Sequence, residues 1–324
     1  MSQPNSAKQE STGANEPSGE GQEAIQVVVG VDYVGKYRPA LDLLFRLGLR
    51  KAKVVLANCA SPAMLNPMYQ SGIYPLLNLD IDRYVAEIGE EVLDAAAGRV
   101  LQHHKVAEKV SLMGPPASEL ARLAERIGAD LIVVQSEQRS RTGAFFAGSV
   151  SRGLAIGASK SLLISKMTAV PTRPLRAVFA TDHSAYAERA FAEFMRLAPS
   201  GIASVHVLSA LDFEDLQESL PSPVTEEELE LGIIAQIREK NEALVRQLKE
   251  AGFKATASFF LGDTQQAIQQ AMAAHEADLL VLGAQGHGFL HRIFIGSTSL
   301  HQVVAEPHSI LLLRPEMPAD GEEG

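Results

Sequence analysis

The stretch Leu279-Leu280-Val281-Leu282-Gly283-Ala284-Gln285-Gly286, followed after nine residues by Gly296-Ser297-Thr298, decides the fold class. Four apolar residues that end at a glycine predict a buried strand, and the glycines after them predict a loop. Glycine has no Cβ, so an anion can approach its backbone N–H group. Gly296-Ser297-Thr298 opens an amphipathic stretch, so the unpaired N–H groups and the positive end of a helix would face the same loop. Strand, glycine loop and helix start together predict a phosphate-binding site.

The chain contains a second copy of this pattern. Residues 129–134 align with residues 277–282 at an offset of 148, and Gly148-Ser149 align with Gly296-Ser297. Near the start of each half the offset becomes 150, which places Asp32 on Asp182. Such an offset change is typical of a loop insertion. We therefore expect a disordered tail at 1–24, two domains at 25–168 and 172–315, and an acidic tail at 316–324.

Strands alternate with helices in both copies. Strands are expected at 25–31, 53–58, 107–113, 130–135 and 161–166, and again near 175–181, 203–208, 255–261, 278–283 and 309–314. The periodicity predicts helices near 38–48, from 81 to beyond 95, at 118–127 and at 149–157 in the first copy. Strands rich in Val, Ile and Leu that alternate with helices predict an α/β fold with parallel sheets covered on both faces.

Composition excludes several classes of protein. The apolar fraction of 46% and the charged fraction of 21% are typical of a soluble globular protein. A single cysteine, Cys59, excludes a disulfide framework and favours the cytoplasm. No run of 18 apolar residues predicts a membrane span. The tails carry net charges of −3 and −4 out of a total of −10, so the body is near neutral and no nucleic-acid partner is expected.

With Gly283, Gly286, Gly296 and Ser297, the pattern Gly-x2-Gly-x9-Gly-Ser/Thr resembles the ATP-binding signature of the universal stress protein family. The resemblance covers about residues 25–315 and is to the tandem, two-domain members. It implies two doubly wound, Rossmann-like domains of the adenine nucleotide alpha hydrolase type, each a five-stranded parallel sheet in the order 3-2-1-4-5. Ligands in such sheets bind where the strand order reverses, between strands one and four.

The resemblance also implies roles for individual residues of the second copy. Asp182 would accept hydrogen bonds from ribose or adenine, although a helix N-cap is the alternative for this residue. The base would be lined by Ala180 and Thr181 and would meet backbone groups of Val207. Gly283 and Gly286 would admit ribose and phosphates, while Gly296, Ser297 and Thr298 would hold the β- and γ-phosphates. The implied ligand is ATP or another adenine nucleotide, with or without Mg²⁺; no catalytic residue and no metal ligand is assigned.

The first copy departs from this motif. Gln135 and Gln138 stand where the second copy has Gly283 and Gly286, and Ala57 aligns with Val207. A glutamine side chain would occupy the path of the phosphates and remove the freedom to adopt a positive φ. We therefore expect no ATP in the first domain in the family manner, one nucleotide per chain, and a helix cap at Asp32.

Histidines near the motif allow two interpretations. His287, His291 and Arg292 could form a cationic lid over phosphate; a zinc site is less favoured, because Gly288 and Phe289 predict a loop. His206 alternates with valines and is expected to be a hydrogen-bonded histidine inside the sheet.

The leading hypothesis is a cytosolic stress-response protein that binds ATP in its second domain as a sensor. A slow ATPase or phosphotransferase is one alternative, although no Gly-x4-Gly-Lys-Ser/Thr loop and no general base are evident. A nucleotide-independent scaffold for a partner protein or other ligand is another. In the sheet order that the resemblance implies, the apolar strands 161–166 and 309–314 would lie at sheet edges, where exposed apolar strands tend to associate. The resemblance to tandem members implies that these strands pair the two domains within one chain; the alternative is that each edge is covered by its own loops, and a homodimer of whole chains stays open.

Overall fold

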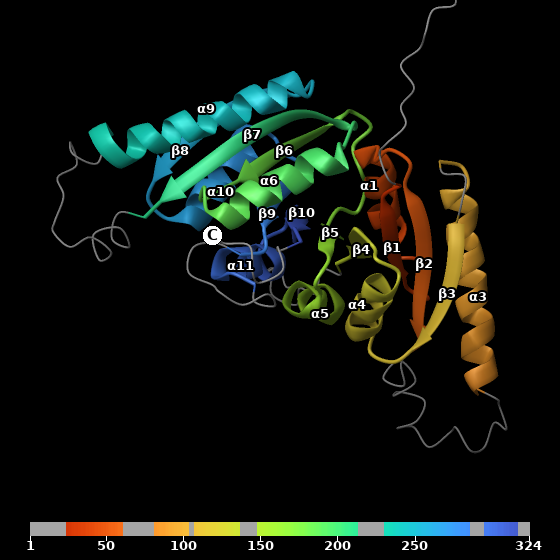
Figure 1. Ribbon diagram of the computed structural model, residues 1–324. Helices are drawn as coiled ribbons and strands as arrows, with labels where there is room; N and C mark the ends of the chain where they lie inside the picture. The colour runs from red at the N-terminus through yellow and green to blue at the C-terminus, as the bar shows by residue number, and fades with distance from the viewer. Residues whose placement is uncertain are drawn as a thin grey trace, which may run out of the picture.

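A computed structural model describes residues 24–60, 81–103, 107–136, 148–212, 230–285 and 295–316. The predicted tails, Gln138, Gly286, His287, His291 and Arg292 lie wholly or mainly outside these ranges. In the described part, ten strands form one continuous sheet in the order β3-β2-β1-β4-β5-β10-β9-β6-β7-β8 (Figure 1). Each half therefore has the order 3-2-1-4-5, which confirms the expected α/β fold.

The elements alternate as expected. The first half contains β1 (Gln26–Val31), α1 (Arg38–Leu47), β2 (Lys53–Ala60), α3 (Ile81–Val100), β3 (Ala107–Met113), α4 (Pro116–Arg126), β4 (Leu131–Gln135), α5 (Ser149–Gly157) and β5 (Ser161–Ser165). The second half contains β6 (Leu175–Ala180), α6 (Ala185–Leu197), β7 (Ile202–Leu211), a π-helical turn (Glu230–Ile234), α9 (Ala235–Glu250), β8 (Lys254–Leu261), α10 (Thr264–Ala274), β9 (Leu279–Gly283), α11 (Ser297–Ala305) and β10 (Ser309–Leu313). No helix within the described ranges is long and apolar enough to cross a membrane.

Helices cover both faces of the sheet. Side chains of α1, α3, α6 and α9 pack on one face, and side chains of α4, α5, α10 and α11 pack on the other. The strand runs β4, β5, β9 and β10 are buried almost throughout because they lie between these two layers. This explains why their sequences are continuously apolar instead of alternating.

The two halves meet through β5 and β10, which pair antiparallel with Leu163 opposite Leu311. The expected pairing of strands 161–166 and 309–314 is thus present. Two hydrogen bonds repeat across this junction: the amide of Lys166 donates to Ser309 Oγ, and the amide of Arg314 donates to Ser161 Oγ, both at 3.0 Å. Lys166 and Arg314 lie 148 residues apart in the sequence and are related by the internal repeat.

Each of these buried cations reaches the end of a helix in the other half. Lys166 Nζ donates to the carbonyls of Gln302 and Glu306 at 2.8 and 2.6 Å, and the Arg314 guanidinium donates to the carbonyl of Ala155. The carbonyl end of a helix is its negative end and favours a cation. These hydrogen bonds link the two halves from both sides of the junction.

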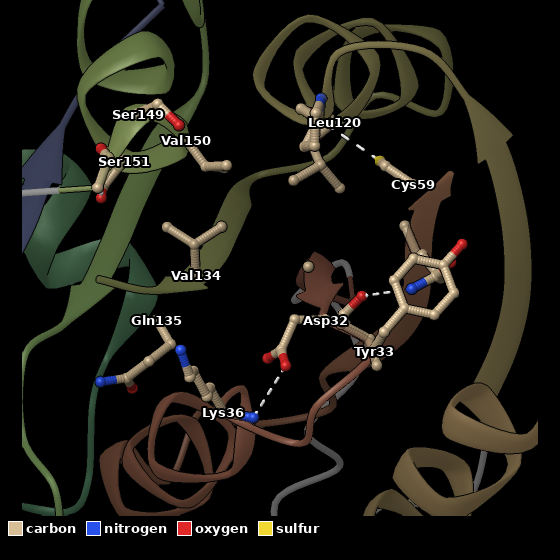
Figure 2. Close-up of a pocket in the computed structure, with 16 residues that line it drawn as sticks. Asp32, Tyr33, Lys36, Cys59, Leu120, Val134, Gln135, Ser149, Val150 and Ser151 are labelled. Carbon is tan, nitrogen blue, oxygen red and sulfur yellow. Dashed lines mark hydrogen bonds between the residues drawn. The ribbon is translucent and has the colours of Figure 1, made fainter. Parts of the chain in front are cut away.

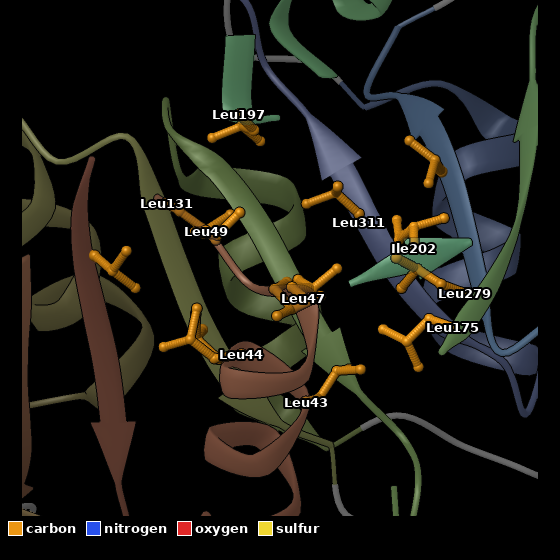
Figure 3. Close-up of a cluster of buried hydrophobic side chains, with 14 of the residues drawn as sticks. Leu43, Leu44, Leu47, Leu49, Leu131, Leu175, Leu197, Ile202, Leu279 and Leu311 are labelled. Atoms are coloured by element: carbon orange, nitrogen blue, oxygen red, sulfur yellow. The ribbon is translucent and has the colours of Figure 1, made fainter. Parts of the chain in front are cut away.

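The halves also share one hydrophobic core. Leucines of α1 and β4 lie beside apolar side chains of α6, β6, β7, β9 and β10 (Figure 3). Gly201 lies so close to the end of α1 that an added Cβ would stand 1.7 Å from the Arg46 carbonyl oxygen. Its amide donates to the Leu47 carbonyl at 2.9 Å. Only glycine fits this close approach between the two halves.

Candidate functional site

The strand order reverses twice, between β1 and β4 and between β6 and β9. In open α/β sheets, ligands bind beyond the carboxyl ends of strands at such points. In the second half, Ala180 at the end of β6 pairs with Leu282 near the end of β9. The predicted residues Ala180, Thr181, Asp182 and Gly283 are therefore neighbours at one edge of the sheet.

The start of α11 is fixed directly against the end of β9. The Gly296 amide donates to the Ala284 carbonyl at 2.7 Å, and Ser299 Oγ donates to the Gly283 carbonyl at 2.8 Å. Gly296 is the N-cap, and no side chain caps this helix within the part of the chain that the structure describes. The first-turn amides of Ser297 and Thr298 consequently lie at an uncapped helix start beside the strand end, where an anion is favoured.

The backbone at Gly283 also has a close neighbour that the sequence did not indicate. It is not among the described glycines with positive φ. A Cβ at this position would lie 3.1 Å from Cδ1 and Cε1 of Tyr186, a residue of α6 whose hydroxyl donates to the Leu313 carbonyl at 3.3 Å. The close approach of this ring leaves little room for a side chain at Gly283.

Gln135, the counterpart of Gly283, lines the cavity of the first half and is held by a hydrogen bond. Its Nε2 donates to the Met167 carbonyl at 3.1 Å, and its amide points away from Ser149 (Figure 2). Lys36 stands at the position of Tyr186 at the offset of 150. Without an aromatic ring at that position, the first half has room for a side chain at the end of β4.

Asp182 is not the helix N-cap. Its Oδ1 accepts hydrogen bonds from the amide and the hydroxyl of Ser184 at 3.0 and 2.7 Å. Ser184 is the N-cap of α6, and its Oγ accepts from the Ala187 amide at 3.1 Å. Asp182 therefore orients the residue that caps the helix. Thr181 is buried, and its Oγ1 accepts from the His183 amide at 3.0 Å.

Val207 lies between two neighbouring strands and not beyond the carboxyl ends of the strands. It pairs with Phe179 on one side and with Ala257 on the other, and its side chain is fully buried. A register shift between Leu175 and Arg176 changes the correspondence of the halves. Ala180 pairs with Leu208, whereas its counterpart Gly30 pairs with Ala57. The structural counterpart of Ala57 is thus Leu208, one residue beyond Val207.

A buried polar cluster beside Asp182 was not expected from the sequence. His183 Nε2 lies 2.9 Å from Asn241 Oδ1 and 3.0 Å from Ser209 Oγ, and Ser209 Oγ donates to Asn241 Oδ1 at 2.8 Å. Burial lowers the pKa of His183, so the ring is held neutral. His183 also has a φ of 55°, which is uncommon for a residue with a side chain. The positive φ at His183 marks a sharp turn at the end of β6.

His206 belongs to the other face of β7. Its ring nitrogens lie 2.9 Å from Thr256 Oγ1 and 2.8 Å from Ser258 Oγ, and its ring stacks on that of His275. This confirms the expectation of a hydrogen-bonded histidine in the sheet. Burial, with a smaller effect of His275, lowers the pKa of His206 to about 4. Within the described ranges no group of histidine, cysteine or acidic residues could hold a metal ion.

The first half has a cavity of about 280 Å³ at the equivalent edge (Figure 2). It is lined by the ends of β1, β2 and β4 and by the starts of α4 and α5. Asp32 lines it and uses Oδ1 to accept from the amides of Val34 and Lys36 at 2.9 and 3.0 Å. Asp32 thus caps the turn before α1 and not α1 itself, which begins at Arg38.

Cys59 and Asn58 form part of the cavity wall. Burial, with a smaller effect of Glu119, raises the pKa of the Cys59 thiol to about 12, so it is protonated at neutral pH. Asn58 is buried and donates through Nδ2 to the Val31 carbonyl at 2.8 Å. The sequence indicated neither residue, because their exposure to the cavity depends on small neighbours on adjacent strands.

Comparisons with known proteins agree with the architecture. The chain is 32% identical over 139 residues to the "Universal stress protein in QAH/OAS sulfhydrylase 3'region" of Thermus aquaticus, covering 42% of this chain and 96% of that protein. A universal stress protein structure from Archaeoglobus fulgidus superposes with a TM-score of 0.59 at 18% identity, covering 89% of this chain and 98% of that one. A functionally unknown protein from Pseudomonas aeruginosa has a TM-score of 0.61 at 16% identity, covering 91% and 94%. At this identity the two structures support the fold alone.

The sequence profile of the universal stress protein family matches twice, at residues 26–166 and 175–312. The two matches correspond to the two halves of the sheet and together span most of the chain. The chain therefore belongs to the universal stress protein family, as a tandem member with two copies of the family's domain.

Proposed function

We propose that this stress-response protein binds an adenine nucleotide, ATP with or without Mg²⁺, in its second half, and acts in the cytoplasm as a sensor of nucleotide occupancy. One observation carries the proposal: the uncapped start of α11 is fixed against the end of β9, at the point where the strand order reverses. Backbone amides held in this way can bind a phosphate group without reorganisation.

The position of the α11 start beside β9 suggests where each part of a nucleotide would bind. The β- and γ-phosphates would bind the first-turn amides of α11, at Gly296, Ser297 and Thr298. The ribose would lie near Gly283, with Asp182 as hydrogen-bond acceptor, and the base would lie against Ala180 and Thr181. Because Val207 is enclosed between two strands, we assign contact with the base to the last residues of β7, Ser209 and Ala210.

A charge placed at the helix start tests the proposal. Ser297→Asp adds a negative charge at the first position of α11, where it favours the helix but repels phosphate. Ser149→Asp makes the same change at the first position of α5 and is the matched control. In isothermal titration calorimetry we expect Ser297→Asp to weaken ATP binding at least tenfold, and Ser149→Asp to leave it unchanged.

Two results would overturn the proposal. Equal weakening by both substitutions would place ATP elsewhere or indicate a nonspecific charge effect. No heat of binding and no rise in melting temperature at millimolar ATP would show that the nucleotide does not bind the folded protein, since a ligand of the native state must stabilise it. The scaffold hypothesis would then take precedence.

A further inference from the structure

The first half contributes a cation to the helix that carries the proposed phosphate site. The amide end of α11 lies against β9, and its carbonyl end is bound by Lys166, which directly follows β5. We propose that Lys166 is a positioning residue for the second half: by holding the carbonyl end of α11, it orients the start of the helix toward the nucleotide. The role rests on the proposed function for the identity of the ligand, but the contact across the junction can be tested without a nucleotide.

Lys166 is held through both its backbone and its side chain. The residue is only 2% exposed. Its amide donates to Ser309 Oγ at 3.0 Å, and its Nζ donates to the carbonyls of Gln302 and Glu306 at 2.8 and 2.6 Å. A buried cation without acceptors is costly, so the end of α11 cannot move away from Lys166 without a loss of stability. These hydrogen bonds therefore tie the carbonyl end of α11 to the first half.

The end of α11 depends on this contact because it lacks the backbone cap of its counterpart. The helix α5 closes with a hydrogen bond from the Ala158 amide to the Leu154 carbonyl at 2.9 Å. Gln302 and Glu306 occupy the same two positions of the repeat at the offset of 148. No such bond joins these two residues, which both lie in the described part of the chain, and the Gln302 carbonyl accepts from Lys166 instead. An ammonium group there satisfies carbonyls at the negative end of the helix.

The two ends of α11 are thus fixed to different halves. At the start, the Gly296 amide donates to the Ala284 carbonyl, and Ser299 Oγ donates to the Gly283 carbonyl. The helix has nine residues, which corresponds to a length of about 13 Å. In so short a helix, a shift of the carbonyl end tilts the amide end as well. Because backbone amides bind phosphate well only when they are held in place, loss of the Lys166 contact should weaken phosphate binding.

The charges around Lys166 make position, and not long-range attraction, its main effect. The Glu306 carboxylate lies at the same end of the helix, where its Oε1 accepts from Gln269 Nε2 at 3.0 Å and lies 3.3 Å from His301 Nε2. Burial lowers the pKa of the nearby His308, with opposing effects of Glu306 and Lys166. An ammonium and a carboxylate at one helix end largely offset each other at a phosphate on the other end.

The repeat supplies a matched control. Arg314 occupies the position of Lys166 at the offset of 148, is buried, and donates to the Ala155 carbonyl of α5. Lys166→Met and Arg314→Met therefore remove equivalent buried cations, each from a helix of the opposite half. Lys166→Arg keeps the cation and introduces the residue type that the repeat already holds at this position. If Lys166→Met does not fold, Lys166→Gln, which removes the charge and keeps a donor, takes its place.

Hydrogen exchange followed by mass spectrometry tests the contact without a nucleotide. We expect Lys166→Met to raise amide exchange in α11 about fivefold or more and to leave α5 unchanged, and Arg314→Met to do the reverse. Lys166→Arg should restore the protection of α11. Unchanged exchange in α11, or equal changes in both helices for each substitution, would overturn the role of Lys166 whether or not the protein binds ATP.

Calorimetry with ATP tests the effect on the proposed site. At about pH 6.5, Lys166→Met should weaken ATP binding about fivefold, whereas Lys166→Arg and Arg314→Met should leave it unchanged. Burial lowers the pKa of Lys166 to about 7, so the cation is lost above that pH, and a neutral amine is a weaker donor. The ratio of the two affinities, unmodified protein to Lys166→Met, should therefore fall toward one by about pH 8.5. His301, Glu306 and His308 are present in both proteins, so the ratio isolates Lys166.

The positioning role and the ATP site fail in different ways. If the unmodified protein binds ATP and Lys166→Met binds it equally well, the role of Lys166 is overturned and the ATP site remains. Equal weakening by Arg314→Met, or an affinity ratio that does not change with pH, also overturns the role. If the unmodified protein binds no ATP, the ATP site and the positioning role are both overturned.

Discussion

The substitution Gly283→Ala separates two explanations for the glycine that ends β9. A Cβ there would lie 3.1 Å from two ring atoms of Tyr186 and 3.3 Å from the Gln285 carbonyl oxygen, so these neighbours must move by a few tenths of an ångström. Tyr186 is 9% exposed and hydrogen-bonded to the Leu313 carbonyl, which limits its movement. Overpacking of this kind costs about 1–2 kcal/mol, equivalent to a melting temperature lower by roughly 2–8 °C.

A double-mutant cycle with Tyr186→Lys tests whether the ring causes this cost. The substitution introduces the residue type found at the equivalent position of the first half. Removal of the ring frees the space, so Gly283→Ala should become neutral or stabilising by up to about 1 kcal/mol in that background. The control is Gly98→Ala on the exposed face of α3, where nothing lies within 4 Å of an added Cβ; it should stabilise by roughly 0.5–1 kcal/mol. Thermal unfolding followed by circular dichroism provides the comparison. An equal cost of Gly283→Ala with and without the ring would refute the reasoning.

Three further predictions concern stability. Burial lowers the pKa of His206 to about 4, so as pH falls from about 6.5 the unfolded state binds the proton first, and stability present above that pH should be lost toward pH 4. His206→Gln should flatten the dependence of the urea midpoint on pH over this range, and an unchanged slope would contradict the prediction. Ser184→Ala removes the cap of α6 and should cost about 1 kcal/mol in urea unfolding; no change would show that Ser184 does not cap the helix in solution. Burial lowers the pKa of Lys166 to about 7 against an opposing effect of Glu306. The unfolded state therefore binds more protons between pH 7 and about 10, and stability should rise as pH increases over that range. Lys166→Met should remove that rise, whereas an identical rise in both proteins would contradict the prediction.

Much of the fold could be predicted from local patterns. The run that leads to Gly283 predicted β9 because a central parallel strand is buried on both faces and needs no polar residue. The repeat at an offset of 148 predicted the second five-strand unit, and the sheet order implied by the family resemblance predicted the edge position of β5 and β10. The pairing of these edges follows because exposed apolar edge strands tend to associate.

The details of the candidate site depended on contacts between distant residues. The Leu175–Arg176 register shift moved Val207 away from the position matched by alignment, and a sequence offset cannot reveal a bulge. The close contact of Gly283 is with the ring of Tyr186, nearly one hundred residues earlier in the chain. Gly30 and Ala57, which line the cavity of the first half, become neighbours only when β1 and β2 pair.

A crystal structure of the full chain grown with ATP would test the central claim most directly. We predict that the triphosphate binds the amides of Gly296, Ser297 and Thr298, with the ribose beside Asp182 and no nucleoside triphosphate in the cavity of the first half. A triphosphate seated at Ser149 beside Asp32, with the second half unoccupied, would contradict it.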